Sequence, residues 1–588
     1  MKKAKAKTDK GRPAAVSAGP ALQAWHYWAA LGAAFLAVSI VYWPAVDGPF
    51  VFDDLYLPFT ASETSGASLA HWVAGIRPLL MFSFWINHTI SGIEPFSYHF
   101  LNLLLHLATG ALAFLIVRKF LEAPWGRPFG QPEAGGTACP TGETAWKRDG
   151  LAAFAAGLFL LHPLQTEAVA YVASRSETLS VMFFYAAFAL FLYRRSEAIG
   201  WLESLGMVAL FAAAASTKEH AAVLPALLLL TDFFWSGWRG IRRNWRLYAI
   251  LAAAGAAALR MVWRVLHGND TAGFAVQGFT WLQYFYSQCR AIWLYLRLFL
   301  LPYGQNIDHD FAVSRTPVEH GAILGLAALL AAVAAAIYYR RRFPLASYGF
   351  LTFLLLLAPT SSFVPILDLV AERRGYLPFI GLLLVVVEFA RRRKAPSTRV
   401  AAALAGVLVV MAVLTYNRSA VWGDPEALWK DTASKSPLKA RPHLQLGFLY
   451  FTQQRCAAAL PEFEAAAKYG KPTYPLLADW GMTYECLGRH DEAIDRLRQA
   501  TLQRWDANTW SMVAWAYLRA GRNDEASQAL DTAQRLNPGL AVTYAYRGDL
   551  FAARNDSAAA ANEYRHALSL DPANQVAQAG LARLGAAR

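Results

Sequence analysis

Apolar residues gather in long runs between residues 24 and 416, and short polar segments separate these runs. A helix needs about 20 mostly apolar residues to cross the hydrocarbon core of a bilayer. Eleven runs reach or approach that length, near 24–46, 97–118, 150–164, 177–193, 202–217, 219–235, 247–266, 319–339, 346–360, 376–390 and 398–416. The pattern predicts an all-α, polytopic membrane domain over residues 24–420.

Basic residues between the runs indicate which side of the membrane each loop faces. The basic arm over residues 1–23 precedes the first run and is expected in the cytoplasm. Later basic clusters each follow an even-numbered run, where a chain that starts inside returns to the cytoplasm. They lie at 118–119, 194–195, 239–246, 340–342 and 391–394. With eleven crossings, everything beyond residue 416 is expected outside the cytoplasm.

One further segment, residues 281–301, is helical in pattern and long enough to span the membrane. Counting it as a crossing would move the basic cluster at 340–342 to the outside. Arg290 and Arg297 are seven residues apart and therefore share one face of a helix. We expect an amphipathic helix in the outer interface. A twelfth crossing with snorkelling arginines is the alternative.

A different pattern begins near residue 441, where the composition turns polar. Small residues recur at 447, 481, 514 and 548, with spacings of 34, 33 and 34, and an aromatic residue follows each after three positions. This is the period of tetratricopeptide (TPR) repeats. The pattern predicts a linker over 421–440 and about four repeats over 441–588, forming an α-solenoid whose groove binds extended peptide. Bracing of the membrane domain is the alternative role.

Cys456 and Cys486 fall in neighbouring repeats. A disulfide between them is conceivable there, but two buried free thiols are the expected state.

The composition of the 588 residues supports the membrane assignment. Apolar residues make up 56% and charged residues 16%, against about 25% charged in soluble proteins. The net charge of +14 would ordinarily prompt a nucleic-acid hypothesis. Here the basic residues sit between apolar runs, so the bilayer, and no nucleic acid, is the expected partner. Short loops rich in Ala and Arg resemble a bacterial protein, which predicts the inner membrane and periplasmic repeats.

Ionisable residues beside membrane helices are costly and are therefore functional candidates. On this topology they gather at the outer face. Asp53 and Asp54 follow the first run in an aromatic setting. Two adjacent carboxylates resist ionising together, so one can hold a raised pKa and act as a general base. A helix cap in a loop is the ordinary alternative for such a pair.

The remaining outer-face residues predict an outward-facing cavity that holds both acids and cations. Spacing along one helix would allow His99 and His106 to bind a metal, but buried histidines bonded to neighbouring helices are commoner, and no metal is predicted. A mixture of acids and cations favours an anionic, lipid-linked substrate. The candidate phosphate-binding cations are Arg77, Arg175, Lys218, Arg260, Arg264 and Arg373, and the other cavity residues are His99, His162, Glu167, Glu219, Asp308, His309 and Glu372.

In chain order, the strings FVFDD, YHFLNLLLH, HPLQTEAVAYVASRSE, KEHAAVLP, NIDHDF and LVAERRGYLP, followed by the repeats, resemble the transmembrane and tetratricopeptide-repeat protein O-mannosyltransferases. The resemblance covers about residues 24–580 and implies the GT-C glycosyltransferase fold. It implies transfer of a sugar from a polyprenyl-phosphate donor to Ser or Thr hydroxyls of secreted proteins. It also places the catalytic acid of the first external loop at Asp53-Asp54. Because this chain has fewer repeats than the eukaryotic members, mannose and other hexoses or pentoses remain open.

The expected reaction inverts the anomeric centre, with the cations at the leaving phosphate and the acceptor polypeptide in the TPR groove. Asp53 is the favoured base and Asp54 its partner, but their adjacency in the sequence does not separate the two roles. No cofactor is required, although a divalent cation at Asp53, Asp54 or His309 is the alternative. Two other functions compete with this one. A transporter or lipid flippase would use the charges as a substrate path, but related membrane halves are not evident. A membrane-tethered TPR scaffold would leave the outer acids without a role.

Overall fold

The computed structural model describes residues 23–60, 66–122, 145–195, 197–268, 271–393 and 397–586. Within these ranges the regular structure is helical, apart from one isolated bridge between Ala272 and Ile366. The chain forms two compact units. The first extends to Ile307 and resumes over Phe311–Asp424, and the second comprises Asp308–Asp310 and the residues from Pro425 onward. The predicted all-α fold class is confirmed.

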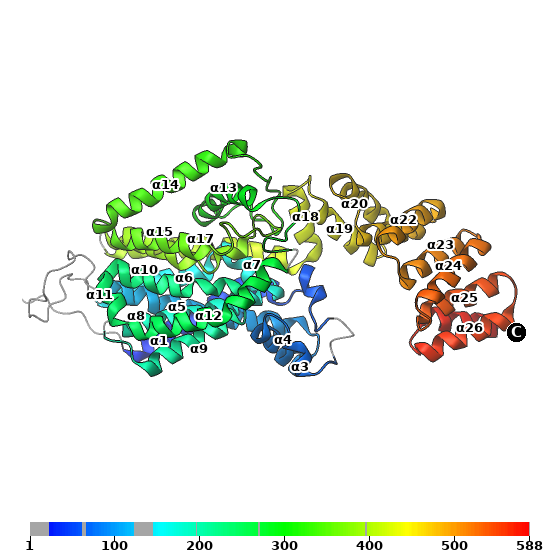
Figure 1. Ribbon diagram of the computed structural model, residues 1–588, viewed down its shortest axis with the longest axis horizontal. Helices are drawn as coiled ribbons and strands as arrows, with labels where there is room; N and C mark the ends of the chain where they lie inside the picture. The colour runs from blue at the N-terminus through cyan, green and yellow to red at the C-terminus, as the bar shows by residue number, and fades with distance from the viewer. Residues whose placement is uncertain are drawn as a thin grey trace, which may run out of the picture. The chain divides into compact units, whose positions relative to one another are not determined.

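Each predicted apolar run forms a helix of the first unit (Figure 1). These helices are α1 (Ala24–Val46), α5 (Pro95–Glu122), α6 (Ala145–Leu161), α8 (Arg175–Arg194), α9 (Trp201–Ala215), α10 (Leu224–Ser236), α12 (Trp245–His267), α14 (Ala322–Tyr338), α15 (Pro344–Leu357), α16 (Phe379–Arg391) and α17 (Ser397–Gly423).

Five helical spans among the described residues are long and apolar enough to cross a membrane. They are Ala24–Val46, Pro95–Glu122, Val172–Arg194, Glu319–Arg341 and Thr398–Gly423. The chain is therefore a multi-pass membrane protein. Several other apolar helices are shorter than a full crossing, so eleven crossings remain a prediction.

Short helical segments fill the connections between the apolar helices and carry several of the candidate site residues. They are η1 (Phe52–Tyr56), α3 (Leu69–Trp72), α4 (Pro78–Ser91), η2 (Pro163–Gln165), α7 (Thr166–Ala170), η3 (Val172–Ser174), η4 (Glu219–Val223), α11 (Trp238–Arg243), η5 (Glu319–Gly321), η6 (Tyr339–Arg341) and η7 (Glu372–Gly375). Residues 162–174 thus form a series of short, mostly buried turns.

Glycines allow close helix contacts in the first unit. A Cβ atom at Gly349 would lie 2.4 Å from the carbonyl oxygen of Gly381, so the backbones of α15 and α16 touch. A Cβ atom at Gly423 would lie 2.1 Å from the carbonyl oxygen of Pro44. Small residues of this kind let membrane helices pack at short distance. As a result, α1 packs directly against α17, the last helix of the unit.

Residues 281–301, expected as an amphipathic interfacial helix, form α13 (Trp281–Leu300). One face is buried, and Arg290 donates to the carbonyl oxygen of Ala312 at 2.9 Å. Arg297 likewise donates to the carbonyl oxygen of Tyr303 at 3.0 Å. The two arginines therefore anchor the chain that follows α13, and the position of this helix relative to the membrane stays a prediction.

The second unit begins with α18 (Pro425–Lys435), which lies within the segment 421–440 predicted as a linker. Successive helix pairs follow (Figure 1). They are α19 (Ala440–Thr452) with α20 (Cys456–Tyr469), α21 (Tyr474–Cys486) with α22 (His490–Gln503), α23 (Ala507–Arg519) with α24 (Asn523–Leu536), and α25 (Ala541–Ala553) with α26 (Ser557–Leu570), before the final α27 (Gln575–Ala586).

The repeat signature has a packing cause. A Cβ atom at Gly481 would lie 2.7 Å from the Leu497 side chain, and one at Gly548 would lie 2.5 Å from Tyr564, so the small residues let paired helices meet. The turn between paired helices needs one residue with a left-handed backbone. Gly488 and Gly521 supply it with φ of 72° each, and Gln454 and Asn555 take the equivalent positions in the outer repeats.

Cys456 and Cys486 form a disulfide, which corrects the expectation of two free thiols. The sequence could not favour this pairing, because a separation of 30 positions along the chain does not determine the Cα–Cα distance, which is 6.2 Å. The bond joins α20 to the end of α21, in neighbouring repeats.

We predict that mass spectrometry of protein alkylated without reductant will recover peptides linked through Cys456 and Cys486. Replacing Cys456 with serine should remove about 2–4 kcal/mol of stabilisation, because the bond restricts the unfolded chain, and should make the repeats more sensitive to protease. Alkylation of both thiols in unreduced protein would contradict the pairing.

Candidate active site

The two adjacent acids at 53 and 54 face different surroundings. Asp53 is exposed, whereas Asp54 is fully buried. The Asp54 carboxylate accepts hydrogen bonds from the backbone N–H of Ala173 at 2.7 Å and of Val51 at 3.2 Å. Asp54 therefore ties turn η1 to turn η3 and leaves Asp53 at the surface.

The backbone just before these acids is strained. Phe52 has a φ of 53°, in the left-handed region that is costly for a residue with a side chain. Its ring stacks against that of Tyr171, with a centroid separation of 6.1 Å. Strain of this kind persists only where neighbouring contacts enforce it, and it is common at functional sites.

Burial raises the pKa of Asp54 to about 8, although the backbone N–H groups of Val51, Ala173 and Val172 act in the opposite direction. The adjacent Asp53 adds only a smaller contribution to this rise. Desolvation disfavours the charged form of a carboxyl group. The two acids thus differ in role: Asp54 holds the turn, and the exposed Asp53 carboxylate is the one open to a substrate.

This raised pKa predicts a pH dependence of stability. A carboxyl group that binds its proton more tightly in the folded state stabilises the fold at low pH. For Asp54 the contribution is fully present below about pH 4, and it is lost as the pH rises through about 8. We expect the thermal midpoint of the wild type to fall more between pH 5 and pH 8 than that of Asp54→Asn. Equal pH profiles would contradict the burial of this carboxyl group.

Tyr171 connects the acidic turn to a nearby arginine. Its hydroxyl oxygen accepts a hydrogen bond from the backbone N–H of Asp53 at 3.0 Å. The guanidinium carbon of Arg373 lies 6.0 Å from the centroid of the Tyr171 ring. The outer acid and the arginine therefore both neighbour one buried side chain.

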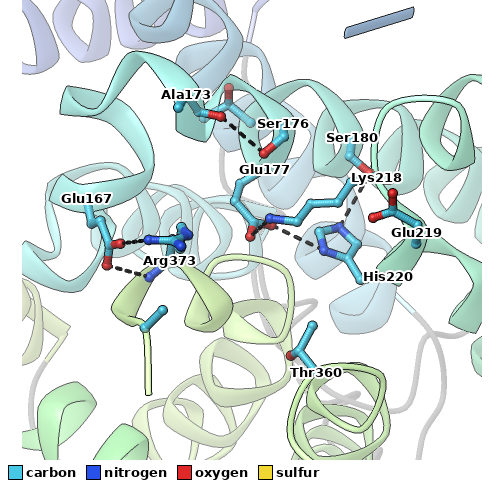
Figure 2. A network of polar contacts seen from close by, with 12 residues as sticks. Glu167, Ala173, Ser176, Glu177, Ser180, Lys218, Glu219, His220, Thr360 and Arg373 are labelled. Atoms are coloured by element: carbon cyan, nitrogen blue, oxygen red, sulfur yellow. Dashed lines mark hydrogen bonds and ion pairs between the residues drawn. The ribbon is translucent and has the colours of Figure 1, made fainter. Parts of the chain in front are cut away.

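Three of the predicted phosphate-binding cations each pair with a carboxylate. Arg77 binds Glu219 through two hydrogen bonds of 2.9 and 2.8 Å. Arg373 pairs with Glu167, and Lys218 pairs with Glu177 (Figure 2). The backbone N–H of Arg373 also donates to Glu167 at 2.9 Å. Figure 2 shows the Glu167–Arg373 pair and the Glu177–Lys218 pair in one network.

The acids of this network are more deeply buried than the cations. Glu167 is 2% exposed and Glu177 1% exposed, against 23% for Arg373. Burial raises the pKa of Glu167, and Arg373 counteracts the rise. His220 also faces Glu177, with Nδ1 at 3.3 Å from Oε2. The buried Glu167 thus holds Arg373 at the partly exposed edge of the cluster, and Arg77 and its partner Glu219 are 39% and 35% exposed, so an anionic group can reach both arginines.

Arg175, predicted as a phosphate-binding cation, is enclosed by neighbouring side chains. It is fully buried, and Phe84 lies 4.4 Å from its guanidinium carbon. Its guanidinium donates to Asn102 at 2.9 Å and to the carbonyl oxygen of Tyr98 at 3.0 Å. The sequence could not reveal this burial, and the Arg175 guanidinium is already bonded within the fold.

Three other predicted cavity residues are buried side chains. His162 is buried and bonds the carbonyl oxygen of Phe299 at 2.9 Å, and His99 is buried near Phe50. Glu372 is buried and accepts from the backbone N–H of Asn306 at 2.6 Å. Each is held by neighbouring elements of the fold.

Asp308 belongs to the second unit, where it pairs with Lys439, and the adjacent His309 offers its carbonyl oxygen to the same lysine. The side chains of Arg260 and Arg264, on α12, lie outside the described residues.

Sequence reasoning missed Tyr171 and assigned no role to Glu177 or His220. The two ionisable residues stand within the quoted motifs, so their charge was a usable signal. Nothing in the sequence distinguishes Tyr171 from other aromatic residues. Among the described residues, no group of three or more His, Cys, Asp or Glu side chains is arranged to hold a metal ion.

Known proteins are similar to this chain both in its repeats and over most of its length. A tetratricopeptide-repeat family model matches residues 507–539. The protein O-mannosyl-transferase F38B6.6 of Caenorhabditis elegans is 25% identical over 441 residues, covering 72% of this chain and 58% of that protein. The protein O-mannosyl-transferase TMTC4 of Homo sapiens is 26% identical over 493 residues, covering 72% of this chain and 63% of its own length.

Among solved structures, ArnT from Cupriavidus metallidurans bound to undecaprenyl phosphate matches 81% of this chain and 80% of its own, with 13% identity and a TM-score of 0.35.

The fold and the site define a multi-pass membrane protein with an acid–cation cluster, followed by a TPR array. The chain is a relative of the transmembrane and tetratricopeptide-repeat (TMTC) protein O-mannosyltransferases, as its motifs indicated. It spans less than two thirds of the length of these two relatives.

Proposed function

We propose that this protein is a membrane glycosyltransferase that moves a sugar from a polyprenyl-phosphate donor to Ser or Thr hydroxyls of a secreted polypeptide. The observation that carries the proposal is one exposed carboxylate, Asp53, linked through Tyr171 to the cation Arg373. A base and an anion-binding group on either side of a reacting centre are what an inverting transfer from a phosphate requires. The relatives named as protein O-mannosyltransferases agree with this chemistry.

In the proposed reaction, Asp53 removes the proton of the acceptor hydroxyl as its oxygen attacks the anomeric carbon. The bond between that carbon and the phosphate oxygen breaks, and the lipid phosphate leaves with the electron pair. Attack from the face opposite the phosphate inverts the anomeric centre.

The leaving phosphate gains charge as the bond breaks, so cations near it stabilise the transition state. Arg77 and Arg373 are the best candidates. Arg373 is more exposed than its partner Glu167, and Arg77 is about as exposed as its partner Glu219. Pairing with Glu219 and Glu167 keeps them in place before the donor arrives. Lys218 is held deeper by Glu177.

The acceptor is proposed to approach through the TPR groove on the outer side of an inner membrane. A disulfide between Cys456 and Cys486 supports an oxidising compartment for the repeats, since disulfides are rare in the cytosol. Single cysteines introduced at positions 53 and 480 and labelled with a membrane-impermeant reagent test this sidedness. If the two cysteines react from opposite sides of the membrane, the proposal is wrong.

The decisive experiment incubates purified full-length protein with radiolabelled polyprenyl-phosphate mannose, or other polyprenyl-linked sugars, and Ser/Thr-containing peptides. Transfer of label to peptide supports the proposal. Movement of the labelled lipid across vesicle membranes without peptide labelling would instead indicate a flippase. If no donor gives either a labelled peptide or movement of the lipid, the result favours a scaffold function.

A further inference from the structure

We propose that Tyr171 is a positioning residue that fixes Asp53 relative to the donor-phosphate site at Arg373. The inference rests on the proposed function and adds a residue that the sequence motifs did not single out. Tyr171 ends α7 and precedes η3, so it stands between the segment that carries Glu167 and the segment that bonds Asp54.

The hydroxyl of Tyr171 controls the acidic turn. It accepts the backbone N–H of Asp53 at 3.0 Å and also interacts with the Asp53 carboxylate. Burial, and then the two neighbouring aspartates, raise the pKa of Tyr171, so the phenol keeps its proton. The hydroxyl therefore bonds the backbone of the proposed base.

The ring of Tyr171 contacts the proposed phosphate ligand, Arg373. The guanidinium of Arg373 lies over it at 6.0 Å, a cation–π arrangement. The Glu167 carboxylate binds both the guanidinium and the backbone N–H of Arg373. The proposed base and the proposed phosphate ligand thus share one rigid aromatic support.

Tyr171 is itself held from several directions. It is 1% exposed, and its ring packs against that of Trp422 at 5.8 Å. Asn102 donates to the carbonyl oxygen of Tyr171 at 3.3 Å, and the buried Arg175 donates to Asn102 at 2.9 Å. Through Asn102, Arg175 therefore helps to hold Tyr171, which in turn positions the proposed base Asp53.

Such positioning matters because a displacement of about 1 Å in a reacting group can lower a rate roughly 100-fold. A side chain that is 1% exposed offers the substrate almost no surface to contact. Loss of its hydroxyl should therefore impair the chemical step much more than it impairs donor binding.

The test compares Tyr171→Phe with Tyr185→Phe in the full-length protein. Tyr185 is also buried, and its hydroxyl donates to a backbone carbonyl, that of Leu377, at 2.8 Å. For Tyr171→Phe we expect kcat to fall about 10- to 100-fold while the donor KM stays within about threefold. For Tyr185→Phe we expect kcat near that of the wild type. A kcat for Tyr171→Phe within about twofold of wild type, or equal losses in both variants, would overturn the inference.

Hydrogen–deuterium exchange of the peptide that contains residues 50–57 gives a readout independent of activity. Removing the hydroxyl frees the Asp53 amide, so Tyr171→Phe should exchange faster there, and Tyr185→Phe should match the wild type. Unchanged exchange in Tyr171→Phe would overturn the inference. If the wild type has no transferase activity, only the proposed function is contradicted. The exchange experiment still decides whether Tyr171 holds the acidic turn.

Discussion

Replacing Asp53 with asparagine is expected to lower the turnover of sugar transfer by about two to four orders of magnitude, the scale of general-base catalysis. The amide keeps the size of the side chain and leaves the backbone N–H bond to Tyr171 in place. It cannot accept the proton of the acceptor hydroxyl. The measurement is initial rate with saturating labelled donor and acceptor peptide in detergent.

Asp47→Asn is the matched control for this variant. Asp47 is an exposed acid at the end of α1, six residues before Asp53, and it should retain activity close to wild type. Full activity in Asp53→Asn, with protein of normal stability, would refute the assignment of the base. In that case Asp54→Asn would become the next variant to measure.

Replacing Arg373 with glutamine is expected to destabilise the protein and to weaken donor binding. Removing one partner of a buried ion pair leaves an uncompensated charge, at a cost of about 3–5 kcal/mol. Here Glu167, at 2% exposure, would be left without its arginine. The free energy of unfolding and the affinity for the donor should therefore fall together.

The double variant Arg373→Gln with Glu167→Gln separates these two effects. It removes both charges, so most of the stability should return, as measured by thermal unfolding. The donor KM should remain at least about tenfold above wild type, because the cation at the leaving phosphate is still missing. Recovery of donor affinity together with stability would show that Arg373 serves the fold alone.

Features that depend on local periodicity could be predicted from the sequence. The apolar runs became helices, and the 34-residue period became stacked helix pairs, because burial and small-residue spacing repeat within each element. Partners across long separations could not be predicted. Arg373 and Glu167 are 206 residues apart, and Arg77 and Glu219 are 142 apart.

Burial was the other property that sequence reasoning could not supply. Arg175 and Arg373 are both arginines beside membrane helices, yet one is enclosed by Phe84 and Tyr98 and the other reaches the edge of the cluster. The difference between Asp53 and Asp54 has the same origin. Adjacent positions in a short turn point to different environments, and only the three-dimensional packing decides which acid is exposed.

The contact between α1 and α17 has a consequence for biogenesis. Insertion proceeds along the chain, yet α1, which precedes the acidic turn, finds its packing partner only when residues 397–423 have entered the membrane. Trp422, which supports Tyr171, arrives in the same helix. A ribosome-bound intermediate therefore has the proposed base and the proposed phosphate ligand but lacks the brace that aligns them, so activity should begin only after the final membrane helix is in place.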